Sequence, residues 1–349
     1  MDYIIHLEPW FRAILYNGFG ILRDDFYNYS PAYMYLLAFS TLLPVKPVIA
    51  IKIICLPFIP IGGYYMTRLA KLFNKPPFIG WLAYSLFLFT PTVIINSSYW
   101  GQADVFYGVP LLATIYYLLK KKPLPAMIAL GISFSFKAQA AFLGPFILLL
   151  LLRKNFSWKY ILIPPGIFFL SCLPVVFVGR SFLDVLMTYP TQTITYRHLS
   201  YEAASMWAYF RWLDTINFDF GVISGIFLCL IAVIIYNYYG YKKIDINNNE
   251  QLFIAALLSL FFMPFILPKM HDRYFYVAEI TSIGFLFLDW RYLWTYILMQ
   301  VSAANVYWAD LRRKGELFPL ELSATLNLIV LFFLVFLFMR PNRNINNKS

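Results

Sequence analysis

Long apolar segments recur along the whole chain and are separated by short polar ones. The candidate membrane spans are residues 48–69, 77–96, 105–119, 160–178, 221–239, 251–267, 275–289, 292–308 and 318–339. Apolar helices of about 20 residues cross a bilayer, and these runs are continuous rather than alternating, which excludes a β-barrel. The pattern predicts an all-α, polytopic transmembrane bundle of about 9 to 11 membrane helices.

Three segments do not fit a simple span. Residues 31–45 are mostly apolar but short, and predict a half-helix or an interfacial helix. Residues 124–152 are too long for one helix and hold Lys137 and Gln139 near their middle, which predicts a hairpin of two short helices. Residues 3–15 predict an amphipathic helix in the membrane interface, with apolar positions at helical spacing at Ile4, Leu7, Phe11, Ile14 and Leu15.

Basic residues indicate the orientation of the spans. They gather at residues 68–75, 120–122, 153–155, 241–243 and 340–348. Because such loops face the cytoplasm, the polar clusters are expected on the opposite side: the amino-terminal segment and residues 100–104, 179–220 and 269–274. All three histidines, His6, His198 and His271, fall on that side as well. The loop 311–316 departs from the charge rule.

Composition supports a membrane protein with a single domain. The chain is 61% hydrophobic and 13% charged, and its mean hydropathy is +0.65. We expect one domain over residues 1–349, with an outer loop at 1–47, a transmembrane bundle at 48–339 and a cytoplasmic tail at 340–349. The net charge of +11 comes from orientation signals that face anionic lipids, so membrane lipids are expected partners and nucleic acid is not. The three cysteines lie in apolar stretches and predict core residues rather than disulfides or metal ligands.

Carboxylates on the predicted outer side are candidates for acid–base chemistry. They are Asp2, Asp24, Asp25 and Asp104. Near an interface, such a group can act as a general base for an acceptor hydroxyl. The alternatives are solvated surface charge for Asp24 and Asp25 and a helix N-cap for Asp104.

Other polar residues suit sugar and phosphate. Trp100 and Gln102 next to Asp104 suit sugar binding by stacking and hydrogen bonding. Lys137 is an ionisable group within an apolar hairpin and therefore a functional candidate, with a phosphate or a carboxylate as its partner. Lys269, His271 and Arg273 form a compact cluster that suits phosphate, and an ordinary charged loop is the alternative. No nucleotide-binding loop is present, so the energy for a reaction is expected to come with an activated substrate.

Together these motifs resemble the GT-C superfamily of integral-membrane glycosyltransferases, and most closely bacterial members related to the dolichyl-phosphate-glucose and dolichyl-phosphate-mannose transferases. The similar segments cover much of the chain: DYIIHLEPWFRAI (2–14), NYSPAYMYLL (28–37), NSSYWGQADVFYG (96–108), FSFKAQAAFLGPFILLL (134–150) and MHDRYF (270–275).

The resemblance implies transfer of a hexose, mannose or glucose, from a polyprenyl-phosphate sugar to a lipid-linked, glycan or protein acceptor, with inversion. It implies a cell-membrane enzyme that acts on the periplasmic or extracellular face. Asp2 matches the family's base, and Asp104 is the second catalytic candidate. A divalent metal ion, Mg²⁺ or Mn²⁺, is left open. The candidate substrate-binding residues are Asp24, Asp25, Asn28, Tyr29, Trp100, Gln102, Lys137, Gln139, His271, Asp272, Arg273 and Tyr274.

Two departures from the family pattern leave alternatives. Family members carry a membrane helix before the catalytic loop, whereas Asp2 directly follows Met1, and Ala32 stands where the family has a second proline. Either a helix precedes Met1 or the chain is an inactive, truncated homologue. The other alternative is a transporter or flippase of a lipid-linked sugar, which predicts charges deep in the spans and two similar halves.

Overall fold

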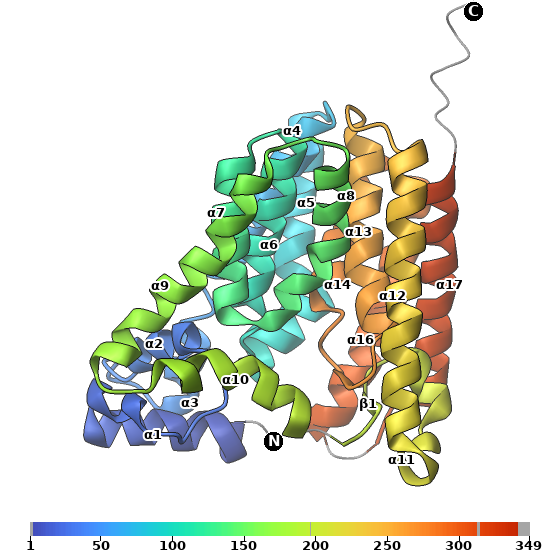
Figure 1. Ribbon diagram of the computed structural model, residues 1–349. Helices are drawn as coiled ribbons and strands as arrows, with labels where there is room; N and C mark the ends of the chain where they lie inside the picture. The colour runs from blue at the N-terminus through green and yellow to red at the C-terminus, as the bar shows by residue number, and fades with distance from the viewer. Residues whose placement is uncertain (1–2, 196, 313–314, 341–349) are drawn as a thin grey trace, which may run out of the picture.

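The computed structural model describes residues 3–195, 197–312 and 315–340. Most helices stand side by side in a bundle, and a group of shorter helices lies across one end of it (Figure 1). This part of the chain is almost entirely helical. The one pair of strands found in it, β1 (Ser200–Tyr201) and β2 (Met270–His271), is parallel, with Tyr201 opposite His271.

The bounds of the helices follow the chain order. The α-helices are α1 (Glu8–Asn17), α2 (Pro31–Ser40), α3 (Pro47–Ile53), α4 (Phe58–Leu72), α5 (Pro77–Phe89), α6 (Asp104–Leu119), α7 (Pro123–Phe136), α8 (Gly144–Leu152), α9 (Ile163–Phe177), α10 (Phe182–Thr195), α11 (Leu213–Ile216), α12 (Phe218–Lys243), α13 (Asn249–Ile266), α14 (Tyr276–Thr281), α15 (Phe285–Leu288), α16 (Leu293–Arg312) and α17 (Leu320–Met339). Short 3₁₀ or π-helical turns are η1 (Tyr3–Leu7), η2 (Phe19–Arg23), η3 (Val93–Trp100), η4 (Ala138–Leu143), η5 (Trp158–Leu162), η6 (Met206–Phe210), η7 (Ser282–Gly284) and η8 (Trp290–Tyr292).

Several helical segments are long and apolar enough to cross a membrane. Among the described residues there are five: Pro47–Leu72, Trp158–Phe177, Phe218–Lys243, Asn249–Ile266 and Leu320–Met339. The pair α5 and η3, bent by 47°, makes a sixth if it is one span. Other apolar helices such as α6 are shorter than the about 20 residues of a straight crossing. The predicted helical, multi-pass membrane fold is confirmed at this level, and the total of about 9 to 11 spans stays a prediction.

The expected hairpin in residues 124–152 is present. Helix α7 ends at Phe136, and Lys137 has an extended backbone with φ −151° and ψ 140°. Both ends of the hairpin meet the carboxyl-terminal end of α12 and the turn after it. Lys121 donates a hydrogen bond to Asn247 in that turn, and Arg153 donates one to the carbonyl of Tyr241 in the last turn of α12. The basic loops at residues 120–122, 153–155 and 241–243 therefore lie together at one end of the bundle, the upper end in Figure 1.

The opposite end of the bundle is covered by α1, α2, α3 and α10 (Figure 1). The predicted short helices at residues 3–15 and 31–45 are both found there, as η1 with α1 and as α2. Leu7, Phe11 and Ile14 are buried, as the amphipathic spacing predicts, whereas Ile4 and Leu15 are exposed. The first turn is π-helical, and its wider hydrogen-bonding pattern changes the angular position of Ile4.

Helix α6 is the centre of the bundle. It packs against α4, α7, α13 and α14, and almost all of its residues are buried. At Gly108 an added Cβ atom would lie 2.8 Å from Cε1 of Tyr276, so α6 and α14 approach each other closely there. The first residue of this central helix is Asp104, which belongs to the candidate functional site.

Candidate functional site

A sharp turn places Asp104 at the start of α6. Gly101 has φ +75° and ψ 31°, the left-handed conformation that glycine adopts without strain, and it ends η3. Asp104 is then the first residue of α6, while Ala103 is the N-cap and makes no side-chain capping bond. The capping alternative is therefore wrong, although a carboxylate at this position is still stabilised by the positive end of the helix dipole.

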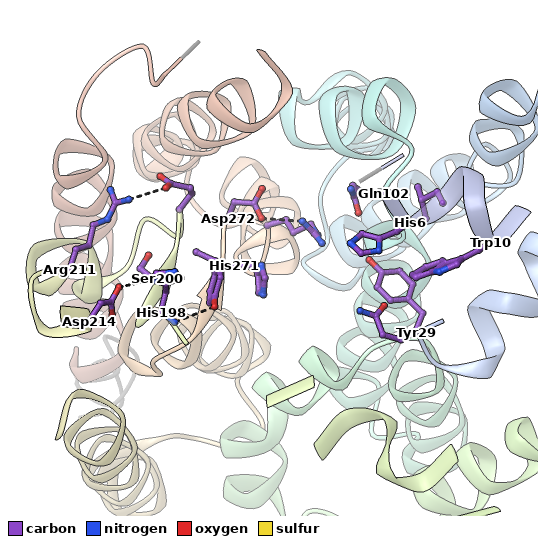
Figure 2. A pocket seen from close by; sticks show the side chains of 15 residues that line it. His6, Trp10, Tyr29, Gln102, His198, Ser200, Arg211, Asp214, His271 and Asp272 are labelled. Carbon is purple, nitrogen blue, oxygen red and sulfur yellow. Dashed lines mark hydrogen bonds and ion pairs between the residues drawn. The ribbon is translucent and has the colours of Figure 1, made fainter. Parts of the chain in front are cut away.

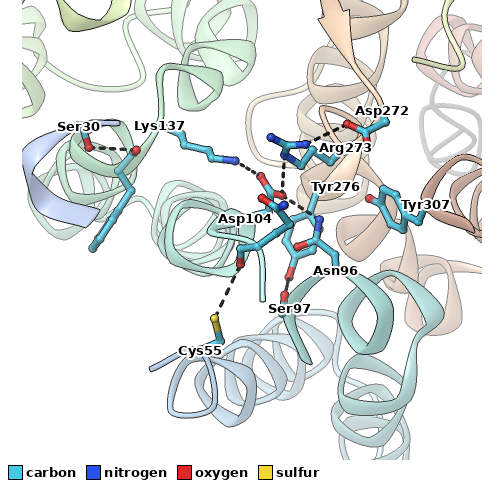
Figure 3. Close-up of polar contacts among 12 residues, drawn as sticks. Ser30, Cys55, Asn96, Ser97, Asp104, Lys137, Asp272, Arg273, Tyr276 and Tyr307 are labelled. Carbon is cyan, nitrogen blue, oxygen red and sulfur yellow. Dashed lines mark hydrogen bonds and ion pairs between the residues drawn. The ribbon is translucent and has the colours of Figure 1, made fainter. Parts of the chain in front are cut away.

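The Asp104 carboxylate is the centre of a buried charge cluster (Figure 3). Lys137 Nζ lies 2.5 Å from Oδ1, and Arg273 Nε lies 3.7 Å from Oδ2. Asn96 Nδ2 donates a hydrogen bond of 2.8 Å to Oδ2. Asp104 has 0% exposure. This geometry favours a role in positioning Lys137 and Arg273 over direct contact of Asp104 with a substrate.

Aromatic rings surround the two cations of this cluster. Lys137 Nζ lies 5.6 Å from the Tyr29 ring centroid, and the Arg273 guanidinium lies 5.5 Å from the Trp100 ring. Arg273 Nη1 also donates to Asp272 Oδ1 at 3.2 Å. Since cations are attracted to aromatic faces, these rings and two carboxylates hold an ammonium and a guanidinium at the base of the site.

A polar cavity of about 380 Å³ opens above the charge cluster. All three histidines line it, on different elements: His6 on η1, His198 before β1 and His271 on β2. Figure 2 shows His6 with Trp10 and Tyr29 on one wall, and His198 with Asp214 and Arg211 on the opposite wall. The amino-terminal helix and the loop 197–217, far apart in the sequence, thus face each other across this polar cavity.

Two side chains of the polar cavity have defined orientations. His198 Nδ1 lies 3.0 Å from Asp214 Oδ2, while Asp214 Oδ1 accepts the backbone N–H of Leu199 at 2.8 Å. The His271 ring stacks on Tyr201 at 4.7 Å between centroids, because the strand register places them opposite each other. An aspartate that orients a histidine is a common arrangement for proton transfer.

A second, larger cavity has a volume of about 850 Å³, and we call it the lipid-side groove. Apolar side chains of η4, α12 and the segment after α13 form much of its lining, including Phe142, Val222 and Ile226. Lys269 and Arg197 add cationic groups, and Asp214 and Asp219 add carboxylates. Ile226 is 46% exposed, so the groove reaches the outer surface of the bundle.

A small junction cavity of about 40 Å³ lies between these two spaces at the charge cluster. Lys137 and Arg273 both line it. It shares Tyr29 and His271 with the polar cavity. With the lipid-side groove it shares Gln139 of η4, Tyr189 and Gln192 of α10, and Tyr274 in the turn before α14. An apolar groove, two cations and a polar cavity thus follow one another in space.

Most of the predicted substrate-binding residues meet at these cavities. The polar cavity is lined by Asn28, Tyr29, Gln102, His271, Asp272 and Arg273, and the junction cavity by Lys137, Gln139 and Tyr274 as well. Trp100 instead is buried behind Arg273 and packs edge-on against Tyr307. The surface-charge alternative fits Asp24, an exposed partner of Arg23, whereas Asp25 pairs with Arg180. Asp2 lies outside the described residues.

Several cavity residues were not singled out from the sequence. In the polar cavity they are Trp10, Tyr201, Arg211 and Asp214, together with His6 and His198, for which only the side of the membrane was expected. Arg180 lines a neighbouring cavity. Their common signal was the predicted outer side, which does not distinguish cavity residues from other surface residues. Within the described residues, no group of three or more histidine, cysteine or acidic side chains is arranged to hold a metal ion.

The fold defines this chain as a helical, multi-pass membrane protein with a polar site at one end of its bundle. No family model matches the chain, and no curated protein matches its sequence.

Proposed function

We propose that this protein is a glycosyltransferase that moves a hexose, mannose or glucose, from a polyprenyl-phosphate sugar to an acceptor hydroxyl. The observation that carries the proposal is the order of the cavities, since apolar groove, cations and polar cavity match the three parts of such a donor. The lipid chain lies in the lipid-side groove, the phosphate at Lys137 and Arg273, and the sugar in the polar cavity. The resemblance to the GT-C superfamily supports the same reading.

The proposed reaction is a direct displacement at the anomeric carbon. The acceptor oxygen forms a bond to this carbon while the bond to the phosphate oxygen breaks, and the electron pair leaves with the phosphate. The acceptor proton passes to a carboxylate, for which Asp2 is the candidate by resemblance. The leaving phosphate gains one negative charge, and Lys137, Arg273 and His271 stabilise it. Asp104 keeps the two cations in place.

The site belongs to the outer face of the cell membrane in this proposal, either periplasmic or extracellular. The basic loops lie together at the other end of the bundle, where Arg153 contacts the last turn of α12 and Lys121 contacts the turn after it. Positive loops remain on the cytoplasmic side of membranes, so the polar cavity faces away from the cytoplasm.

The test is sugar transfer by the purified protein in lipid nanodiscs. Radiolabelled polyprenyl-phosphate mannose and glucose are supplied with lipid, glycan and peptide acceptors, with EDTA or with added Mg²⁺ or Mn²⁺. We expect transfer by the wild type and a loss of about 10² to 10³-fold when Lys137 is replaced, the usual effect of removing one electrostatic stabiliser. Absence of transfer under all these conditions would contradict the proposal, and flipping of the donor without transfer would favour a transporter.

The variants are chosen to separate catalysis from folding. Lys137→Met alone leaves the Asp104 carboxylate buried without its ammonium partner, whereas Asp104→Asn/Lys137→Met removes both charges together. We expect the double variant to fold and still to lack transfer. Lys52→Met is the matched control. Lys52 belongs to α3, its ammonium lies over the Tyr99 ring, and it lines none of the cavities described above. Normal transfer by the double variant would contradict the role given to Lys137.

A further inference from the structure

A further polar cavity adjoins the polar cavity beside α1 and α10, and it shares Gln192 of α10 with the lipid-side groove. Its volume is about 400 Å³, and we call it the side cavity. It shares His6, Trp10 and Asn28 with the polar cavity, so these residues form the boundary between the two. Its walls come from α1, the segment 25–28 and α10, and Gln192 of α10 donates a hydrogen bond to the Asn28 carbonyl.

A buried arginine organises the side cavity. Arg180 has a side chain that is 5% exposed, and its Nη2 lies 2.9 Å from Asp25 Oδ1. Its guanidinium stacks over Tyr27 at 4.3 Å from the ring centroid. Burial raises the pKa of Tyr27 above its ordinary value, so its hydroxyl stays neutral and donates to the Leu22 carbonyl. Nη1 of Arg180 is buried and has no hydrogen-bond partner within the described part of the chain.

The exposed charged groups of the side cavity are carboxylates. The Asp25 side chain keeps 91% exposure although it pairs with Arg180, and Asp184 is exposed on α10. Two carboxylates and one guanidinium leave a net negative charge. Amide and hydroxyl groups of Asn28, Gln192, Thr188 and Thr191 complete the polar lining, and Trp10 and Phe26 add aromatic surface.

This chemistry selects the ligand. Carboxylates accept hydrogen bonds from hydroxyl groups, aromatic surface packs against the C–H faces of sugar rings, and a concave site with a few placed polar groups gives orientation. The net negative charge disfavours uronic acids and phosphorylated chains. A neutral, hydroxyl-rich chain therefore fits the side cavity better than an anionic one.

We infer that the side cavity binds the acceptor, and that the acceptor is a neutral glycan whose terminal sugar reaches past His6 into the polar cavity. This inference rests on the proposed transferase function and names its acceptor class. Donor and acceptor then approach by different routes, the donor through the lipid-side groove and the acceptor between α1 and α10. Their reacting atoms meet in the polar cavity, which borders both routes.

Direct binding without donor tests the inference independently of transfer. The protein in nanodiscs is titrated with neutral mannotriose and maltotriose and with anionic trigalacturonate, and contacts are read by saturation-transfer NMR. In parallel titrations the same neutral glycan is attached to a polyprenyl diphosphate or to a peptide. These titrations distinguish a free, a lipid-linked and a protein-linked glycan as the acceptor. We expect a neutral trisaccharide to bind and trigalacturonate to bind at least tenfold more weakly.

Two adjacent aspartates and one distant one provide the variants. Asp184→Ala is expected to weaken neutral glycan binding about tenfold, the effect of losing one good hydrogen bond. Asp24→Ala is the matched control, since Asp24 is exposed and pairs with Arg23 outside the cavity. Asp25→Asn keeps the shape beside Arg180 and is expected to weaken binding as well.

Three results would overturn the inference: no neutral glycan binds in any of the three forms, trigalacturonate binds more tightly, or Asp184→Ala and Asp25→Asn bind like the wild type. Binding that responds to these variants in a protein without transfer activity would support the side cavity as a glycan site while contradicting the transferase proposal. Sugar transfer by a protein that shows no such binding would support the transferase proposal and contradict the side cavity as a glycan site.

Discussion

At the scale of single residues, the buried charge cluster is the feature that most constrains this protein. Lys137 is 8% exposed and Asp104 0%, and their charged atoms are 2.5 Å apart. Removing two charges from water has a large desolvation cost, which the mutual attraction of the pair roughly offsets. Such a pair contributes little net stability when complete, but it is costly to break.

Replacement of Asp104 by asparagine is expected to destabilise the protein by about 3–5 kcal/mol, because Lys137 is then left buried without its carboxylate. Lys137→Met should be similarly harmful. Asp104→Asn/Lys137→Met should cost clearly less than the sum of the two, since no unpaired charge remains between them. Thermal unfolding of the four proteins in detergent gives the coupling energy, and additive losses would contradict the importance of the pair.

A carboxyl pair in the outer loops responds to pH. Burial, together with a hydrogen bond to Glu202, raises the pKa of Glu316 above its ordinary value. The folded state then holds the Glu316 proton more tightly than the unfolded state. The contribution of the protonated Glu316 to the free energy of unfolding is therefore complete below the unfolded-state pKa and is lost as pH rises through the folded-state pKa. The unfolding temperature of wild type minus that of Glu316→Gln is therefore expected to fall as pH rises from about 4 to 7. A difference that stays constant, or that increases, would show that the pair does not act in this way.

At the scale of the elements, close contacts between helices depend on glycine. Helices α4 and α5 pack at Gly62 and Gly63, where added Cβ atoms would lie 2.1 Å from Cζ of Phe87 and 2.7 Å from Cδ2 of Tyr84. Small residues let membrane helices approach closely, and this gain in packing replaces the hydrophobic effect that is absent between helices in lipid.

Gly62→Ala is expected to destabilise the α4–α5 pair by about 1–3 kcal/mol, the usual cost of overpacking, in spite of the higher helix propensity of alanine. Gly166→Ala in α9 is the matched control, because no atom lies within 4 Å of its added Cβ, and it should be neutral or slightly stabilising. The midpoints of unfolding in detergent, measured for both variants and the wild type, distinguish these two effects. Equal behaviour of both variants would argue against the close approach of α4 and α5.

At the scale of the whole molecule, the two ends of the bundle differ in character. The basic loops lie together at one end, and the polar cavity, the side cavity and the short helices α1, α2 and α10 lie at the other (Figure 1). This asymmetry matches the rule that positive loops stay in the cytoplasm.

Cysteine labelling tests this orientation. A membrane-impermeant thiol reagent added to intact cells is expected to label Asp184→Cys, and to label Lys121→Cys only after permeabilisation. The native Cys55, Cys172 and Cys229 are buried, so the background should be low. Labelling of Lys121→Cys in intact cells, with Asp184→Cys protected, would reverse the proposed orientation.

The parts of the molecule that hydropathy and charge describe were predictable. The hairpin break at Lys137, the short helix at residues 31–45 and the grouping of basic loops all follow from the length and polarity of local segments. The polar motifs that form the site could be recognised in the sequence, but the contacts between their side chains could not. Trp100 is buried behind Arg273 instead of lining the polar cavity, because the turn at Gly101 and the start of α6 determine its direction.

By itself, the sequence determined that this is a multi-pass helical membrane protein with its polar motifs on one side, because hydropathy and charge act locally and can be read along the chain. Only the tertiary structure decided that Asp104 is buried between Lys137 and Arg273, that His198 pairs with Asp214, and that the cavities adjoin. These features join residues that are far apart in the sequence, and their distances depend on how whole helices pack.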